Sequence, residues 1–158
     1  MTLRLVAPIA GRVVALADVP DEAFAAGILG PGLAIQPPTA PGVDGVVPLV
    51  RVVAPCDGRL AKVHPHAVAL ETGETGVIVH LGIDTVTLHG EGFEVLVADR
   101  DDVVTGQELL RWDPTAALAR GLATVTPVVV FEHRDFTVTL LVEIGQEVAA
   151  GDPLLQVD

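Results

Sequence analysis

Two histidines stand at the ends of runs that read as buried strands. The apolar run Val77–Val79 leads into His80, and His66 precedes the apolar run of residues 67–70. The segment ETGETG, residues 71–76, separates the two runs and predicts a β-hairpin. In an ideal hairpin about this turn His66 and His80 lie opposite each other, with Cβ atoms about 4.5–5.5 Å apart. Two imidazoles side by side could do chemistry together, and a pair of half-exposed surface histidines is the alternative.

Composition restricts the class of protein. The chain has 158 residues and is 50% hydrophobic, which suits one folded domain over residues 1–158. No apolar run approaches the roughly 20 residues of a membrane helix, so we expect no stable membrane insertion. The single cysteine, Cys56, excludes an internal disulfide framework and favours a cytoplasmic location. The formal net charge of -12 argues against a nucleic-acid partner and favours a protein partner with a basic surface.

The chain contains two pairs of similar segments. VAPIAGR at residues 6–12 recurs as VAPCDGR at residues 53–59. VVTGQELLRWD at residues 103–113 recurs as VAAGDPLLQVD at residues 148–158. Two copies are too few for a solenoid, so they predict one domain built from two interlocked, related halves. Chance recurrence of common turn residues is the alternative.

Short apolar runs separated by Gly, Pro and Asp predict an all-β fold. Runs rich in Val, Ile, Leu and Thr predict strands at 11–16, 33–37, 58–63, 67–72, 76–82, 93–98, 126–131, 136–142 and 152–158. So many short strands indicate a mostly antiparallel β-sandwich or barrel-like fold. Two or at most three short helices are expected. One follows Asp21 over residues 21–29, and one spans 113–124 with Asp113 as N-cap and Pro114 as first helical residue.

One long motif resembles a known family. VHLGIDTVTLHGEGF, residues 79–93, resembles the signature around the phosphorylated histidine of the glucose-family enzyme IIA component of the bacterial sugar phosphotransferase system. Other segments resemble that family in the same order: APIAGRVVALADVPDEAFAAGILGPGLAIQP (7–37), VVAPCDGRLAKV (52–63), HAVALET (66–72) and TPVVV (126–130). The resemblance covers nearly the whole chain and implies the family's small, mostly antiparallel β-sandwich.

The resemblance implies a phosphoryl relay, in which the chain is a phosphotransferase component and not a free-standing enzyme for a small molecule. It implies that His80 takes a phosphoryl group from phospho-HPr on Nε2, the tele nitrogen, and passes it to a cysteine on the IIB domain of a sugar permease. It implies that His66 donates a hydrogen bond to the phosphoryl oxygens. Regulatory protein targets are a further class of partner. No cofactor or intrinsic metal is implied, although His66 and His80 could hold zinc with a third ligand from a partner.

The chemistry of the relay suits these residues. Imidazole, with an unperturbed pKa of about 6.5, is an uncharged nucleophile near pH 7. We expect His80 Nδ1–H to donate to the carbonyl of Gly82, which would leave Nε2 free to attack. Asp84 would repel an incoming dianion, so we expect it at the rim of the site, where it and Asp21 would pair with Lys or Arg of partner proteins.

Apolar residues near the histidines are expected to form a docking face for partners, with a place in the core as the alternative for each. They are Phe24, Ile28, Leu29, Val68, Ile78 and Val86. His64 departs from the family, whose members usually have a threonine two residues before the supporting histidine to orient its ring. An imidazole could also form a hydrogen bond there, but Pro65 restricts the local backbone, so the orientation of His66 is less determined than that of His80.

Two other classes of function compete with the relay. H-x-H at 64–66 and H-x-x-x-D at 80–84 resemble the motifs of lysostaphin-type zinc peptidases, with His66, His80 and Asp84 as ligands. The order of the motifs is reversed here, and the N-terminus does not resemble the signal peptide that a cell-wall hydrolase needs. The repeats also resemble biotinyl and lipoyl carrier modules, but Lys62, the only lysine, lies within a predicted strand and not in an exposed hairpin.

Overall fold

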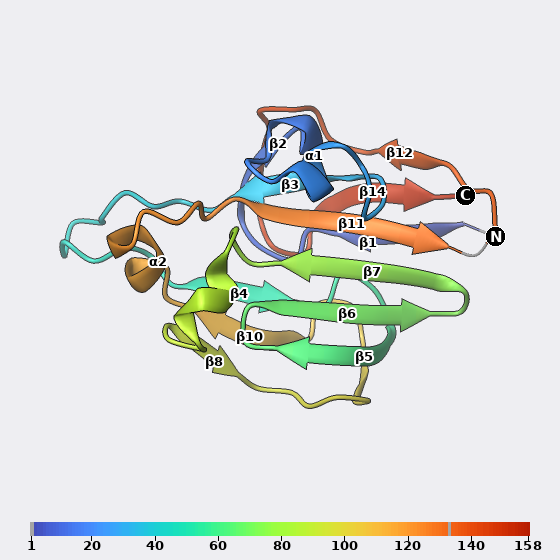
Figure 1. The fold of residues 1–158 in the computed structure, drawn as a ribbon. Coiled ribbons are helices and arrows are strands. Elements are labelled where there is room, and N and C mark those ends of the chain that lie inside the picture. The colour runs from blue at the N-terminus through green and yellow to red at the C-terminus, as the bar shows by residue number, and fades with distance from the viewer. Residues whose placement is uncertain (1, 133) are drawn as a thin grey trace.

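The computed structural model describes residues 2–132 and 134–158. Within them the strand pairs are all antiparallel. They form one eight-stranded sheet and two three-stranded sheets, with only short helical segments between strands (Figure 1). The expected all-β, mostly antiparallel fold is confirmed.

Seven of the strands belong to a continuous stretch in the middle of the chain. They are β4 (Val50–Val53), β5 (Gly58–His64), β6 (Ala67–Thr72), β7 (Thr75–His80), β8 (Phe93–Val95), β9 (Asp102–Val103) and β10 (Glu108–Trp112). The other seven come from the two ends of the chain. They are β1 (Leu3–Val6), β2 (Gly11–Val14), β3 (Gly32–Gln36), β11 (Thr126–Glu132), β12 (Val138–Leu140), β13 (Glu147–Val148) and β14 (Pro153–Val157).

The sheets show that the two sets of strands are copies of one motif. The eight-stranded sheet has the order β13-β2-β3-β11-β7-β6-β5-β9, and the small sheets have the orders β1-β14-β12 and β4-β10-β8. Each strand of one set occupies the place of its counterpart in the other, with β11 and β7 meeting at the centre. The middle stretch is therefore inserted between β3 and β11 of the other copy, as the repeated segments predict.

Backbone hydrogen bonds join the repeated segments reciprocally. Val6 N–H donates to Pro55 O at 2.9 Å, and Val53 N–H donates to Pro8 O at 2.8 Å. The two VAP segments, predicted as a repeat, thus lie against each other about a local twofold axis. This contact ties the two halves together at the centre of the molecule.

The apolar core lies between the large sheet and the two small ones. Val77 and Val79 of β7 belong to it together with Val52 of β4 and Trp112 of β10. A second, smaller cluster lies outside the large sheet, where Phe24 packs with Val129 and others. β11 is buried on almost its whole length because it has apolar neighbours on both faces.

The two predicted helices are shorter than the sequence suggests. α1 (Glu22–Ala25) begins after Asp21, whose carboxylate accepts from Ala23 N at 2.9 Å as an N-cap should. α2 (Thr115–Ala119) begins one residue later than predicted, with Asp113 accepting from Thr115 N. Two 3₁₀ turns complete the set, η1 (Leu16–Asp18) and η2 (Thr85–Leu88). No helix among the described residues is long and apolar enough to cross a membrane.

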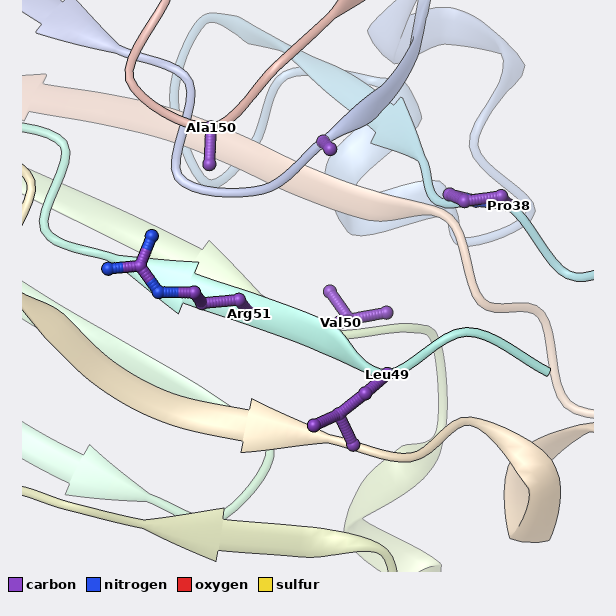
Figure 2. A pocket seen from close by; sticks show the side chains of 6 residues that line it. Pro38, Leu49, Val50, Arg51 and Ala150 are labelled. Atoms are coloured by element: carbon purple, nitrogen blue, oxygen red, sulfur yellow. The ribbon is translucent and has the colours of Figure 1, made fainter. Parts of the chain in front are cut away.

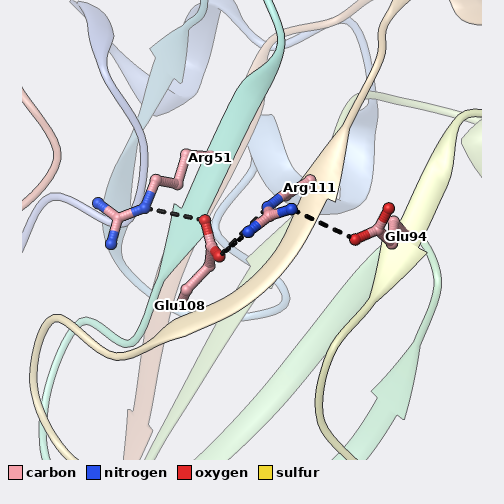
Figure 3. Close-up of polar contacts among 4 residues, drawn as sticks. All are labelled: Arg51, Glu94, Glu108 and Arg111. Atoms are coloured by element: carbon pink, nitrogen blue, oxygen red, sulfur yellow. Dashed lines mark hydrogen bonds and ion pairs between the residues drawn. The ribbon is translucent and has the colours of Figure 1, made fainter.

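A ladder of charges crosses the outer face of the β4-β10-β8 sheet (Figure 3). Arg51 of β4 and Arg111 of β10 are direct cross-strand neighbours, which would repel each other. Glu108 accepts from Arg51 Nε at 2.9 Å and from Arg111 Nη2 at 2.7 Å, and Arg111 also reaches Glu94 of β8 at 3.5 Å. The hydrogen bond from Arg111 lowers the pKa of Glu108 and so favours its ionised form. The negative charge of Glu108 offsets the repulsion between the two arginines on this exposed face.

Candidate functional site

His80 is the last residue of β7. Side chains alternate along the strand, so that Val77 and Val79 face the core while Ile78 and His80 face the other side of the sheet. His80 Nδ1 lies 2.6 Å from Gly82 O. A carbonyl only accepts, so Nδ1 carries the proton, and Nε2 keeps its lone pair. The hydrogen bond expected from the sequence is present.

His66 meets His80 through a different hairpin register from the predicted one. Ala67, and not His66, is the cross-strand partner of His80, because the hairpin turns through two residues, Gly73 and Glu74, with Thr72 opposite Thr75. His66 instead lies in the turn between β5 and β6, where strand alternation does not fix its side chain. The two ring centroids are 5.2 Å apart, with the planes at 74°. The predicted proximity is therefore correct, although the predicted register is wrong by one residue.

His64 and Phe24 flank the histidine pair. The ring of His64, at the end of β5, stacks on His66 with centroids 5.5 Å apart and planes at 30°. Phe24 of α1 packs against His80 from the other side, with centroids 5.3 Å apart. Four rings thus form a row, His64, His66, His80 and Phe24. His64 contacts His66 through its ring face, where the sequence suggested a hydrogen bond.

Both histidines of the pair are neutral near pH 7. Burial lowers the pKa of His66 to about 4, and repulsion from protonated His80 and His64 acts in the same direction. Burial also lowers the pKa of His80, opposed by the Gly82 hydrogen bond and by the carboxylates of Asp21 and Asp84. A neutral imidazole is the form that can act as a nucleophile.

Asp21 and Asp84 lie at the edge of this site. Asp21 is held by its capping hydrogen bonds at the start of α1. Asp84 is exposed, with a left-handed backbone (φ 60°), at the start of η2. Neither forms an ion pair with Lys or Arg of residues 2–132 and 134–158. Pairing of these two residues with Lys or Arg of partner proteins stays a prediction.

Comparison with known proteins identifies the family. The model of the family described as phosphoenolpyruvate-dependent sugar phosphotransferase system, EIIA 1, matches residues 3–136. The chain belongs to this EIIA family. That family is a component of a sugar phosphotransferase system, as the sequence resemblance implies, and the zinc-peptidase alternative gains no support.

Relatives include both multidomain and separate EIIA proteins. The N-acetylglucosamine-specific EIICBA component of Klebsiella pneumoniae is 38% identical over 156 residues, 97% of this chain and 22% of its own length. The glucose-specific EIIA component of Borreliella burgdorferi is 38% identical over 132 residues, 82% of this chain and 65% of its own. The chain thus spans about a fifth of the multidomain relatives that it matches.

A solved structure agrees with the fold of this EIIA domain. Glucose permease IIA from Mycoplasma capricolum is 28% identical, with a TM-score of 0.82, over 99% of this chain and 96% of that one. The match includes both halves of the duplicated motif. The β-sandwich that the resemblance implied is therefore the fold of this family member.

The predicted docking residues of the EIIA domain divide into two groups. Ile28 and Val86 are 73% and 59% exposed, Leu29 is also exposed, and Ile78 is half-buried. Val68 is buried in the main core, because its cross-strand partner Val79 faces inward. Phe24 is buried too, at 5% exposure, so its contact is with His80. For Val68 and Phe24 the alternative, a place in the core, is therefore the correct one, and neither lies on an exposed docking face.

Three residues that the sequence analysis did not single out hold the segment after His80. Leu81 N–H donates to His66 O at 2.7 Å, and the hydroxyl of Thr85 donates to Leu81 O at 2.6 Å. Ile83 N–H donates to Ala123 O at 2.9 Å. The sequence offered as a signal a glycine and a threonine, Gly82 and Thr85, shortly after His80; the structure shows that Gly82 is left-handed (φ 75°) and that Thr85 is buried.

The residues of the site do not form a metal centre by themselves. Among the described residues, which leave out His133, no group of three or more His, Cys, Asp and Glu is placed to hold a metal ion. His66, His80 and Asp84 therefore do not form the zinc site of the peptidase alternative. Zinc normally takes four ligands, so the two adjacent imidazoles would need others from a partner.

A small apolar cavity of the EIIA domain lies away from the histidines. It has a volume of about 140 Å³ beside β4 (Figure 2) and is lined by Ala10, Pro38, Leu49, Val50, Arg51 and Ala150. No residue of the predicted site is among them. Its lining carries no nucleophile or acid–base pair, so we assign it no part in the chemistry.

Proposed function

We propose that His80 is the phosphoryl carrier of this EIIA domain. Its Nε2 lone pair attacks the phosphorus of phospho-HPr, the P–N bond to the HPr histidine breaks, and a P–Nε2 bond to His80 forms. The observation that carries this assignment is the 2.6 Å hydrogen bond from Nδ1–H to Gly82 O, since it leaves Nε2 as the free nucleophile. The proton stays on Nδ1 throughout the transfer.

His66 has the position of a supporting donor. Phosphoryl transfer depends mainly on positioning and on stabilising the charge of the transferred group. The His66 ring lies edge-on to His80 with centroids 5.2 Å apart, within reach of a group carried on His80. A neutral His66 with its N–H toward the phosphoryl oxygens would donate to them without needing a cofactor. His64, stacked on His66, supports the orientation of that ring.

We further propose that the phosphoryl group passes to the cysteine of a sugar-permease IIB domain in the cytoplasm. The thiolate attacks the phosphorus and the P–Nε2 bond breaks, which returns neutral His80. Relatives named EIICBA components support an EIICB partner. Relatives named for N-acetylglucosamine, glucoside, glucose and mannose share 36–43% of their residues with this chain over the matched segments. Because these identities do not favour one sugar, we assign the choice of sugar to the permease.

The surface around His80 suits a protein partner with a basic rim. Ile28 and Leu29, shortly after α1, and Val86 of η2 have exposed side chains that could supply apolar contact, and Asp21 and Asp84 supply negative charge. The formal net charge of -12 adds long-range attraction to a basic surface. Two partners could use this face in turn, and so could regulatory proteins. A zinc ion at such a contact would need ligands from the partner as well as from His66 and His80.

The test is phosphorylation by purified components. Incubation with phosphoenolpyruvate, enzyme I and HPr should add one acid-labile phosphoryl group, measured by intact mass. His80→Gln should abolish it, and His89→Gln, at an exposed histidine after η2, should not. His66→Gln should still accept the group but should transfer it more slowly to a IIB domain. Normal labelling of His80→Gln would refute the assignment and make His66 the next candidate.

A further inference from the structure

Leu81 connects the two histidines of the site. It follows His80 in the chain, precedes Gly82, and donates its N–H to His66 O at 2.7 Å. Its side chain is buried, at 1% exposure, in the main core. Any shift of the Leu81 backbone would therefore move the Gly82 carbonyl relative to Nδ1 of His80, and would also disturb the backbone of His66.

The Leu81 carbonyl is held by one side chain. Thr85 is 1% exposed, and its hydroxyl donates to Leu81 O at 2.6 Å. The hydroxyl thereby closes a short loop over residues 81–85 and satisfies a carbonyl in a buried setting. A buried carbonyl that loses its donor tends to rotate toward another one. Such a rotation is easy here, because the next residue, Gly82, is a glycine.

The methyl group of Thr85 packs on the same glycine. A Cβ placed on Gly82 would lie 2.7 Å from Thr85 Cγ2 and 2.7 Å from Ala123 O. Only glycine fits this space, and its φ of 75° is the left-handed conformation. Thr85 thus touches the 81–82 backbone with both of its branches, the hydroxyl on Leu81 and the methyl near Gly82.

We propose that Thr85 is a positioning residue of the relay. Through Leu81 its hydroxyl holds the Gly82 carbonyl where that carbonyl fixes the tautomer of His80, and it keeps His66 beside His80. Thr85 does not touch the transferred group. For its effect on rate the inference rests on His80 being the phosphoryl carrier, whereas its effect on the tautomer does not.

Two substitutions separate the hydroxyl from the shape of the side chain. Thr85→Val keeps the branched shape and removes the donor, and Thr85→Ser keeps the donor and removes the methyl. Thr85→Ala is a second variant without the donor, and it cannot overpack. The matched control is Thr87→Val, because Thr87 lies in the same 3₁₀ turn and its hydroxyl also donates to a nearby backbone carbonyl, Asp84 O at 2.7 Å, but Thr87 is exposed and its bond is not to Leu81.

The first measurement is the ¹⁵N NMR spectrum of the His80 ring, assigned by its loss in His80→Gln. The wild type, Thr85→Ser and Thr87→Val should show the tautomer protonated at Nδ1. Thr85→Val and Thr85→Ala should show a mixture of tautomers. Amide spectra and thermal melts identify variants that are folded, and if Thr85→Val is not, the Thr85→Ala and Thr85→Ser pair decides.

The second measurement is the initial rate of phosphorylation by phospho-HPr. Loss of the buried hydrogen bond from Thr85 to Leu81 should lower the phosphorylation rate of Thr85→Val and Thr85→Ala about tenfold, whereas Thr85→Ser should react at close to the wild-type rate. A pure Nδ1–H tautomer and a normal rate in Thr85→Val would overturn the inference. A Thr85→Ser protein as impaired as Thr85→Val would also overturn it, because the methyl would then be responsible. Failure of the wild type to accept phosphate would refute the proposed function but leave the tautomer result intact.

Discussion

At the scale of single residues, the site depends on two imidazoles that stay neutral although they are close together. Water-poor surroundings favour the neutral ring, and each ring disfavours a charge on the other. His80 gains from the Gly82 hydrogen bond and two carboxylates, whereas burial and two neighbouring histidines act together on His66. Protonation of His66 is therefore expected to lower the stability of the folded protein more than protonation of His80.

This difference predicts how stability depends on pH. The pKa of His66 is about 4 in the folded protein and about 6.5 when unfolded, so the unfolded chain binds more protons between these values. Stability is therefore fully present above pH 6.5 and falls as the pH is lowered toward 4. Between pH 7 and 5 we expect His66 to account for a loss of about 1 kcal/mol, reduced because the ring is only partly buried.

Denaturant unfolding at pH 7, 6 and 5 measures this effect. His66→Gln should flatten the pH dependence relative to wild type, since its side chain does not titrate. His89→Gln, at an exposed position, should keep the wild-type slope. Equal slopes for His66→Gln and wild type would show that the burial of His66 does not control acid stability.

At the scale of elements, the short helix α1 connects the rim charge to the nucleophile. Asp21 caps the helix, and three residues later Phe24 packs on the His80 ring. A four-residue helix has little stability of its own, so its cap matters. The carboxylate of Asp21 thus has two separable roles, a hydrogen-bond acceptor for the helix and a charge near His80.

Two substitutions of Asp21 should separate these roles. Asp21→Ala should lower the free energy of unfolding by about 1 kcal/mol through loss of the cap, and Asp21→Ser should largely preserve it. Both should slow association with phospho-HPr, more at low than at high salt, because both remove the charge. Denaturant unfolding and stopped-flow association measure the two effects. If Asp21→Ser associated at the wild-type rate, the docking role of Asp21 would be rejected.

At the scale of the whole molecule, the two halves have equivalent backbone positions that are occupied by different residues. Arg100 N–H donates to Leu60 O, and Gly145 N–H donates to Val13 O in the other half. Both residues are left-handed, with φ of 70° and 92°. Glycine adopts this conformation freely, whereas arginine does so at a cost of roughly 1 kcal/mol. The half that carries His80 thus retains a strained residue that the other half lacks.

Exchanging these residues should change stability in opposite directions. Arg100→Gly should leave the free energy of unfolding unchanged or raise it by up to about 1 kcal/mol, since relief of strain is partly offset by the greater freedom of unfolded glycine. Gly145→Arg should lower it by about 1 kcal/mol, although no neighbouring atom obstructs a side chain there. Urea unfolding of both proteins is the measurement. A stabilised Gly145→Arg protein would contradict the equivalence of the two turns.

The sequence by itself determined the features that depend on neighbours along the chain. Turn residues between apolar runs indicated the predicted strands, Asp21 marked the start of a short helix, and the repeated segments indicated the duplicated architecture. The hydrogen bond from His80 to Gly82 spans only two residues, so it too could be predicted. Strands β1, β4, β9, β10 and β13 were not among the predicted strands, and their places became clear from their pairing with other segments of the chain.

The tertiary structure alone decided which groups meet. A one-residue difference in a turn changes every cross-strand pair, so the sequence did not reveal that Ala67 is the partner of His80 or that Val68 faces the core. Likewise, Phe24 packs under His80 only because α1 lies on the outer face of the large sheet. The register of this hairpin depends on which residues of the segment 71–76 form the turn, and several of them could do so. The contact of Phe24 with His80 joins segments far apart in the chain, where local preference does not act, so it is set by the packing of α1 on the sheet.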